Sequence, residues 1–324
     1  MAVFTPIELE DITQWISQEF DIGQATDIRG IHGGIENSNF FLDTIKDGKK
    51  HEYVLTIFER LSAEQLPYYL ELMRHLANQG IPVPKPIENQ KGEILFTLKG
   101  KPTAIVSKLP GLSRLEPEAN HCELVGDMLA KMHLAGKDFP KNQENLRSLA
   151  WWQKTIPLVS PHLNTSQKEL LTHELSVQEE FFSSSAYDIL PQGASHCDLF
   201  RDNVLFDPKG SNSSHDQLGG FFDFYFAGTD KWLFDIAVTA NDWCLSENKH
   251  DLDPVRLDAF MKAYQSVRPL TKEEQASWPL MLRAAALRFW VSRLWDFYLP
   301  RDAQMLTPHD PTHFEHILLS RRYL

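Results

Sequence analysis

The segment His196-Cys197-Asp198-Leu199-Phe200-Arg201-Asp202-Asn203 sets an aspartate and an asparagine five residues apart in a short polar loop. Asn203 opens an apolar strand, and a second strand after a turn at 207–219 ends at Asp223. A hairpin returns its two ends to one place, so Asn203 and Asp223 can share one space. Their amide and carboxylate oxygens are hard ligands of the kind that Mg²⁺ prefers. Asp198 is then placed to accept a proton from an attacking hydroxyl, help worth roughly 10²–10⁴-fold in rate.

These residue types match what phosphoryl transfer from ATP requires, namely metal ions that bridge the phosphates and an oriented nucleophile. His196 is expected to brace the loop by hydrogen bonding. The alternative is that Asp198, Asp202 and Asn203 only form turns, since such a motif would arise by chance in roughly a few per cent of chains this long. The strand, turn and strand that follow, with Asp223, favour the catalytic interpretation.

A glycine-rich loop at 30–39 leads into the strand that begins at Phe40. Gly33 and Gly34 let backbone N–H groups approach a polyphosphate closely, and Asn37, Ser38 and Asn39 continue the same loop. The sequence holds no GxxxxGK[ST], which excludes a P-loop NTPase. A plain glycine turn is the alternative.

The first hundred or so residues must position this loop, and they are mainly β. Short runs of β-forming residues at 39–44 and 53–58 flank Asp47-Gly48, a hairpin turn signal. A helix is expected at 63–79, with Gly80 as its stop. A second hairpin is expected at 94–98 and 102–106.

After residues 109–111 the pattern becomes helical. Helices are expected at roughly 118–133, 166–184, 231–244, 254–265 and 272–298, around a β-rich island at 194–226. Long homogeneous runs indicate an α+β protein with two lobes rather than alternating β and α. We expect a β-rich nucleotide-binding lobe at 1–108, a hinge near 106–111, and a catalytic and substrate-binding lobe at 109–324.

Composition narrows the class of protein. The chain has 324 residues, 42% hydrophobic and 23% charged, with a formal net charge of −12. An acidic chain disfavours nucleic-acid binding, and a phosphate ligand must be met by local cations or metal. No secretory signal or membrane-spanning run is expected, since arginines interrupt the apolar stretch at 281–299. Three dispersed cysteines favour a reduced, cytoplasmic protein. The sequence does not indicate an oligomeric state.

The whole pattern resembles the aminoglycoside phosphotransferase and choline kinase superfamily, whose members share the protein-kinase fold. Within it, the chain is most similar to the bacterial homoserine kinases. The similarity is carried by the blocks 34–41, 53–59, 80–84, 196–206, 222–225, 234–237, 241–244 and 288–294.

The resemblance implies a protein-kinase-like two-lobe fold that uses ATP and Mg²⁺. It implies Asp235 as a structural anchor behind the catalytic loop, and an adenine-binding hinge between Val106 and Leu109. Two departures stand out. Thr56 occupies the strand position where many members have a lysine for the ATP phosphates, and Cys197 replaces a usual glycine. The cation that would meet the ATP phosphates is therefore unassigned. The nearby candidates are Lys46, Lys49, Lys50 and Arg60.

The resemblance also implies phosphorylation of the hydroxyl of L-homoserine to O-phospho-L-homoserine, a step of threonine synthesis. Arginine suits the substrate carboxylate and an acidic residue suits its ammonium. The candidates are Arg288 and Arg293 in the last long helix, Arg201 and Asp242. A salt bridge to another helix is the alternative for the two helical arginines, and capping or packing for Asp242. Other acceptors (choline, methylthioribose, an aminoglycoside) and a nucleotide-binding pseudokinase remain alternatives.

Overall fold

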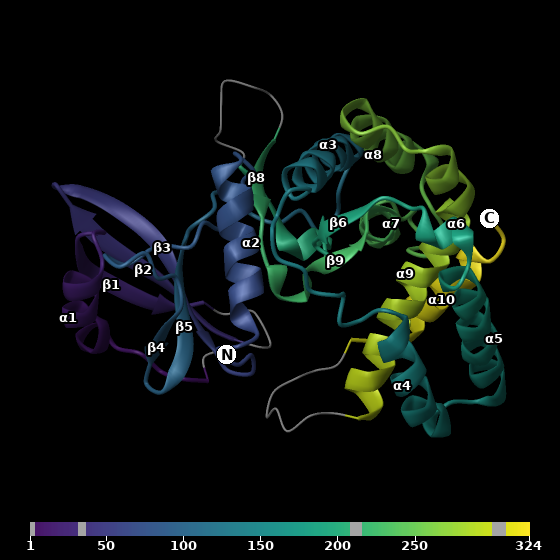
Figure 1. Cartoon of the computed structure of the whole chain (residues 1–324), viewed down its shortest axis with the longest axis horizontal. Coiled ribbons are helices and arrows are strands. Elements are labelled where there is room, and N and C mark those ends of the chain that lie inside the picture. Colours follow the sequence, from purple (N-terminus) through teal and green to yellow (C-terminus); the bar gives the residue numbers. More distant parts are fainter. Residues whose placement is uncertain (1–3, 32–36, 208–215, 300–308) are drawn as a thin grey trace. The chain divides into compact units, whose positions relative to one another are not determined.

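The computed structural model describes residues 4–31, 37–207, 216–299 and 309–324. The protein is α+β, as predicted, and divides into two compact units (Figure 1). Unit 1 comprises Met1–Pro110 with Gly220–Phe222, and unit 2 comprises Gly111–Gly219 with Asp223–Leu324.

Unit 1 contains a five-stranded antiparallel sheet with the order β1-β2-β3-β5-β4. Its elements are α1 (Leu9–Glu19), β1 (Gln24–Gly30), β2 (Asn37–Lys46), β3 (Lys49–Phe58), α2 (Leu66–Asn78), β4 (Phe96–Leu98) and β5 (Lys101–Ser107). The hairpin predicted at Asp47-Gly48 is confirmed. Both turn residues have positive φ, 51° and 73°, which matches the twist of the paired strands.

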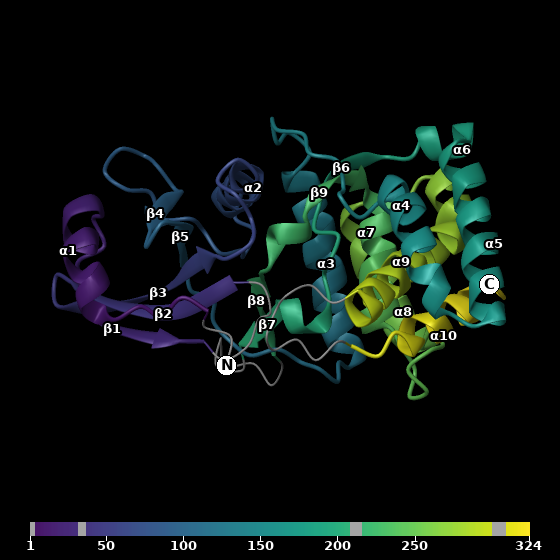
Figure 2. The same cartoon turned by 90° about the horizontal axis from the view of Figure 1, so that it is seen from below.

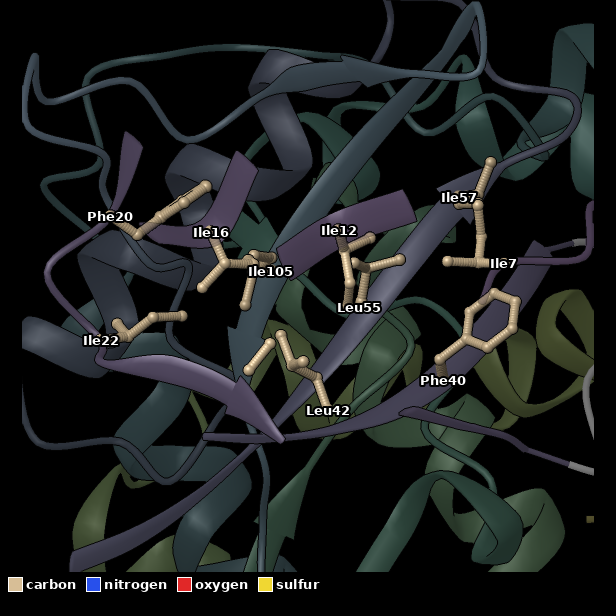
Figure 3. Close-up of a cluster of buried hydrophobic side chains, with 11 residues drawn as sticks. Ile7, Ile12, Ile16, Phe20, Ile22, Phe40, Leu42, Leu55, Ile57 and Ile105 are labelled. Carbon is tan, nitrogen blue, oxygen red and sulfur yellow. The ribbon is translucent and has the colours of Figure 1, made fainter. Parts of the chain in front are cut away.

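The core of unit 1 lies between α1 and the sheet (Figure 3). Ile12 and Ile16 of α1 are fully buried against apolar side chains of the strands, among them Leu42 and Leu55. Burial of each such side chain contributes roughly 1.5–3 kcal/mol. Helix α1 was not predicted from the sequence.

Helix α2 begins three residues later than predicted and ends one residue earlier. Gly80 has φ 83°, and the Ile81 N–H donates to the carbonyl of Leu76 (3.0 Å). This is the glycine stop expected from the sequence, because glycine adopts the left-handed conformation at no steric cost.

Unit 2 is mainly helical, with two small two-stranded sheets, β6-β9 and β7-β8; the last two residues of β8, Gly220 and Phe221, are counted in unit 1. Its elements are α3 (Ala119–Ala135), α4 (Leu149–Val159), α5 (Thr165–Phe182), α6 (Ser185–Asp188), β6 (Gln192–Ser195), β7 (Val204–Asp207), β8 (Gln217–Phe221), β9 (Gly228–Lys231), α7 (Trp232–Trp243), α8 (Pro254–Val267), α9 (Lys272–Tyr298) and α10 (Thr312–Arg321), with 3₁₀ turns η1 (Ser160–His162), η2 (Arg201–Asn203) and η3 (Phe224–Phe226). Figure 2 shows α4, α5 and α9 grouped together.

Two features of the packing organise unit 2. Helix α7 is buried along its whole length, which explains its apolar composition. Helices α3 and α8 lie side by side (Figure 1). Gly126 permits their close approach, since a Cβ there would come within 2.3 Å of the Phe260 carbonyl oxygen.

The five predicted helices of this region are confirmed to within two residues at each end, and α9 has the predicted bounds 272–298. Helices α4, α6 and α10 were not predicted. Within the ranges that the structure describes, no helix combines the length and the apolar character needed to cross a bilayer.

Candidate active site

The loop between β6 and β7 carries the residues singled out by their spacing. The Asn203 side-chain amide donates to the carbonyl oxygen of Asp198 (2.8 Å), which ties the two ends of the loop together. The turn η2 closes it further, with the Asn203 N–H donating to Phe200 (2.9 Å). Because the amide nitrogen of Asn203 is engaged with the loop, its oxygen is the atom available to a cation.

Asp235, in the first turn of α7, holds the start of this loop. Its two carboxylate oxygens accept the backbone N–H groups of His196 (2.7 Å) and Cys197 (2.8 Å). Burial by itself raises the pKa of Asp235, but hydrogen bonds, led by that from His133, outweigh it and the pKa lies below its usual value. The carboxylate is therefore an ionised group inside the protein, which needs this full set of donors.

Cys197 has a left-handed backbone, with φ 62°. This explains why a glycine is usual at this position in the superfamily that the sequence resembles, since only glycine adopts such a conformation without strain. Burial raises the pKa of the Cys197 thiol well above its usual value, so the thiol is protonated and unreactive.

Asp223 stands at the start of η3, also in the left-handed region (φ 64°, ψ 58°). Strained conformations of this kind cluster at functional sites. The next residue, Phe224, is buried against the ring of His196, with centroids 4.5 Å apart. His196 is thus packed against Phe224, and Asp223 is the residue immediately before Phe224 in the chain.

Arg288, on α9, approaches Asp198. Its Nη2 lies 3.4 Å from Asp198 Oδ1, and the arginine side chain is only 4% exposed. Arg288 Nε is buried and has no hydrogen-bond partner among the described residues. The guanidinium lies over the ring of Phe289 at 3.7 Å. Burial lowers the pKa of Arg288, and the charge of Asp198 partly offsets this.

Arg201 and Asp242 are joined to each other. The Asp242 carboxylate accepts from Arg201 Nε (3.0 Å), Nη2 (3.1 Å) and the backbone N–H (2.8 Å). Arg201 Nη1 also donates to the carbonyl of Leu115 (2.9 Å). Most of the hydrogen-bonding capacity of both groups is therefore used within unit 2.

Arg293 lies one and a half turns beyond Arg288 on the same helix. Its Nη1 is 3.4 Å from the carbonyl oxygen of Asp310, and its guanidinium lies 4.5 Å from the centre of the Phe314 ring. Burial lowers the pKa of Arg293 to about 10, so it remains a cation at neutral pH.

The predicted nucleotide residues belong to unit 1. Gly33 and Gly34 lie outside the described residues. Ser38 is buried in β2, where its hydroxyl donates to Glu59 (2.6 Å) and accepts from the backbone of Phe4 and Thr5. Asn37 is buried at the start of β2.

Asn39 and Thr56 face each other across β2 and β3, and the Thr56 hydroxyl donates to Asn39 Oδ1 (2.8 Å). Val106 is buried in β5 and Leu109 is half-buried just beyond it. Two of the candidate phosphate cations are already in ion pairs, Lys46 with Asp21 on the surface (2.8 Å) and Lys50 with the buried Asp43 carboxylate (2.9 Å).

Sequence reasoning missed several polar contacts. Lys101 of β5 contacts Glu59 and donates to Thr5 (2.8 Å), pairing residues distant in the chain. His133 of α3 and Tyr264 of α8 lie behind Asp235. The available signal was a polar side chain within an apolar helical stripe, as at His133.

A magnesium ion would be held by few protein groups here. No set of three or more His, Cys, Asp or Glu residues suited to a metal occurs in the described part of the chain. One amide oxygen from Asn203 and one carboxylate from Asp223 nonetheless fit Mg²⁺, which keeps several waters and takes substrate phosphates as its other ligands.

Comparison with known proteins identifies the family that the sequence matches. The profile of the phosphotransferase enzyme family matches residues 27–273. Homoserine kinase of Cupriavidus pinatubonensis (strain JMP 134 / LMG 1197) is 60% identical over 321 residues, covering 99% of this chain and 96% of that protein. Homoserine kinase of Burkholderia cenocepacia (strain HI2424) is 57% identical over 322 residues, covering 99% and 96%.

Solved structures share the fold at low identity. Amicoumacin kinase hAmiN, in complex with AMP-PNP, Ca²⁺ and Ami, superposes with a TM-score of 0.69 at 17% identity, covering 98% of this chain and 92% of that one. Choline kinase of Cryptosporidium parvum Iowa II gives a TM-score of 0.64 at 14% identity, covering 98% and 96%. The protein-kinase-like fold expected from the sequence is confirmed.

Proposed function

The chain belongs to the phosphotransferase enzyme family and to the homoserine kinases within it, and from this premise we propose that it transfers the γ-phosphoryl group of ATP to the hydroxyl of L-homoserine. The observation that carries the proposal in the structure is the loop that joins Asp198 to Asn203 and is anchored by Asp235.

Asp198 acts as the base in this proposal. It orients the homoserine hydroxyl and takes its proton as the oxygen bonds to the γ-phosphorus. The bond from that phosphorus to the β–γ bridging oxygen breaks, and ADP leaves with the bond electrons. The products are O-phospho-L-homoserine, ADP and a proton on Asp198.

Asn203 and Asp223 would hold magnesium through the Asn203 amide oxygen and the Asp223 carboxylate. The bound ion would neutralise charge that develops on the phosphate oxygens. The hydrogen bond from the Asn203 amide nitrogen to the carbonyl of Asp198 keeps that amide oriented.

Arg288 is our candidate for the substrate carboxylate. It is a buried cation whose Nε lacks a partner in the described chain, and its contact with Asp198 is long, at 3.4 Å. A guanidinium binds a carboxylate through two parallel hydrogen bonds, so an amino-acid substrate would satisfy it. Arg288 beside Asp198 disfavours choline and aminoglycosides as acceptors, because these molecules are themselves cationic. Arg293 is a second candidate. For Asp242 and Arg201, the mutual ion pair supports a role in shaping the site.

ADP release coupled to oxidation of NADH tests the proposal on homoserine, serine, threonine, choline, methylthioribose and kanamycin. We expect turnover with homoserine, and a loss of roughly 10²–10⁴-fold in kcat for Asp198→Asn. Asp202→Asn, four residues on in the same loop, is the matched control and should retain activity. Absence of turnover with every acceptor would contradict a kinase, and an Asp198→Asn enzyme as active as the wild type would contradict Asp198 as the base. Preference for choline or kanamycin would overturn the acceptor alone.

A further inference from the structure

A line of buried polar side chains runs through unit 2 toward the catalytic loop. Glu274 forms a two-point ion pair with Arg268, with distances of 2.6 and 3.1 Å. Arg268 Nε donates to the hydroxyl oxygen of Tyr264 (2.6 Å), and that hydroxyl lies 2.7 Å from His133 Nδ1. Glu274, Tyr264 and His133 are fully buried, and Arg268 is 8% exposed.

The line continues from His133 to the loop. His133 Nε2 lies 3.0 Å from Asp235 Oδ2, the same oxygen that accepts the N–H of His196. The other carboxylate oxygen accepts the N–H of Cys197, the residue before Asp198. We refer to Glu274, Arg268, Tyr264, His133 and Asp235 as the relay.

Only one assignment of hydrogens satisfies every member of the relay. The Arg268 guanidinium has donors only, so the Tyr264 oxygen accepts from it. The single hydroxyl hydrogen of Tyr264 then donates to His133 Nδ1. The remaining ring hydrogen must lie on Nε2, where it donates to Asp235. A neutral imidazole fits this pattern, and burial lowers the pKa of His133, which favours the neutral form.

Packing holds the relay in register. Gly126 lets α3 approach the backbone of α8 at Phe260. His133 lies two turns beyond Gly126 on α3, and Tyr264 lies one turn beyond Phe260 on α8. The close approach of the helices brings these two side chains within hydrogen-bond distance. The ring of Trp232 stacks on His133, with centroids 5.6 Å apart and planes inclined by 12°. The imidazole therefore has little freedom to rotate.

We propose that His133 and Tyr264 are positioning residues for phosphoryl transfer, which set the orientation of the Asp235 carboxylate and through it the backbone from which Asp198 projects. Cys197 holds a left-handed conformation (φ 62°) that a non-glycine residue leaves when its restraints weaken. Asp235 supplies the restraint by accepting the Cys197 N–H, and the relay fixes Asp235. A small rotation of this carboxylate would displace the base. The inference rests on the proposed kinase function for its catalytic readout.

Kinetics of relay variants test the proposal. Tyr264→Phe removes one hydroxyl and should lower kcat about 10-fold, and His133→Leu about 10²-fold, as expected when a reacting group moves by about 1 Å. The KM values for ATP and homoserine should change by less than about twofold, because the relay touches neither substrate. His133→Gln retains a nitrogen that can donate to Asp235 and should recover part of the kcat lost in His133→Leu.

A second readout does not depend on activity. Amide hydrogen exchange, followed by NMR, should show the N–H groups of His196 and Cys197 protected in the wild-type protein. Tyr264→Phe should accelerate these two more than the amides of α9 measured in the same sample. In ¹⁵N spectra, His133 should be the neutral Nε2–H tautomer at neutral pH.

Arg268→Lys and Arg283→Lys form a matched pair. Each replaces an arginine in a two-point pair with a buried glutamate, but only Arg268 belongs to the relay; Arg283 pairs with Glu174. We expect kcat to fall in Arg268→Lys alone when the two are compared at equal loss of Tm. Equal kcat in Tyr264→Phe, His133→Leu and the wild type would overturn the proposal, as would equal losses in the two lysine variants. If the wild type itself shows no turnover, the proposed function fails, and unchanged exchange at His196 and Cys197 in Tyr264→Phe would overturn the relay separately.

Discussion

Arg283 and Arg288 are two arginines on the same helix, α9, and their surroundings differ: Arg283 is half-buried and pairs with a buried glutamate, whereas Arg288 is itself buried. Arg283 donates to both carboxylate oxygens of Glu174, at 3.0 Å from Nε and 2.6 Å from Nη2. Gln178 donates to the same carboxylate (2.9 Å). Arg288 lies 3.4 Å from the Asp198 carboxylate and over the ring of Phe289, and its buried Nε has no hydrogen-bond partner in the described residues.

The difference is what we expect between an arginine with a structural role and one that binds the substrate. A buried charge is tolerated when its hydrogen bonds are satisfied, and both oxygens of the buried Glu174 carboxylate accept from Arg283. Arg288 has an incomplete set although desolvation already disfavours its charge. An incompletely satisfied cation beside the proposed base supports our proposal that an anionic group of the substrate completes it.

The largest effect is expected from Arg283→Met, which leaves the fully buried Glu174 carboxylate without its cation. Breaking a buried pair in this way costs about 3–5 kcal/mol of unfolding free energy, measured by urea denaturation. The KM for homoserine should not change in the fraction that remains folded. An unaltered unfolding free energy would show that the complete hydrogen bonding of Arg283 has no structural role.

Arg288→Met should have the opposite profile. We expect kcat/KM for homoserine to fall about 100-fold, equivalent to roughly 3 kcal/mol, because a carboxylate would lose its cation. Stability should stay equal or rise, since a poorly compensated buried charge is replaced by an apolar side chain. Arg288→Lys is the control that keeps the charge and loses the two-point geometry. Unchanged kcat/KM in Arg288→Met would remove it from the substrate site.

His133 extends the comparison to pH, because it too is a buried group with a complete set of partners. Its folded-state pKa is depressed by burial, so its contribution to stability is present above pH 6.5 and is lost as pH falls below that value. Below pH 6.5 the wild type should therefore lose stability more steeply than His133→Gln, by at most about 1.4 kcal/mol per pH unit. Asp235, whose pKa is also lowered, contributes a similar loss only below about pH 4. Parallel curves for the two proteins would show that His133 does not titrate on unfolding.

An exposed arginine supplies the baseline. Arg74 pairs with Glu88 at 3.2 Å on the surface, where both side chains contact solvent. Arg74→Ala should change the unfolding free energy by less than about 1 kcal/mol, as is usual for exposed pairs. A loss comparable to that of Arg283→Met would mean that burial of the carboxylate partner is not what distinguishes these two ion pairs.

Local signals in the chain were sufficient for much of the fold. Helix α9 was predicted with its observed bounds from its helical pattern, and the structure shows a capping box of Thr271 and Glu274 where it begins. The turns at Asp47-Gly48 and Gly80 followed from residues that tolerate positive φ. Helix α4 was missed because Pro157 interrupts its pattern.

The sequence alone determined the chemistry: an aspartate and an asparagine at a fixed spacing, followed by a hairpin and another aspartate, indicate phosphoryl transfer because few other reactions need those groups in that order. Tertiary structure alone decided which charges meet. Arg288 contacts Asp198, Arg201 pairs with Asp242, and His133 contacts Asp235. These partners are 90, 41 and 102 positions apart in the chain. Pairings at such separations depend on how whole helices pack, through contacts such as Gly126 against Phe260, and no local pattern of residues encodes them.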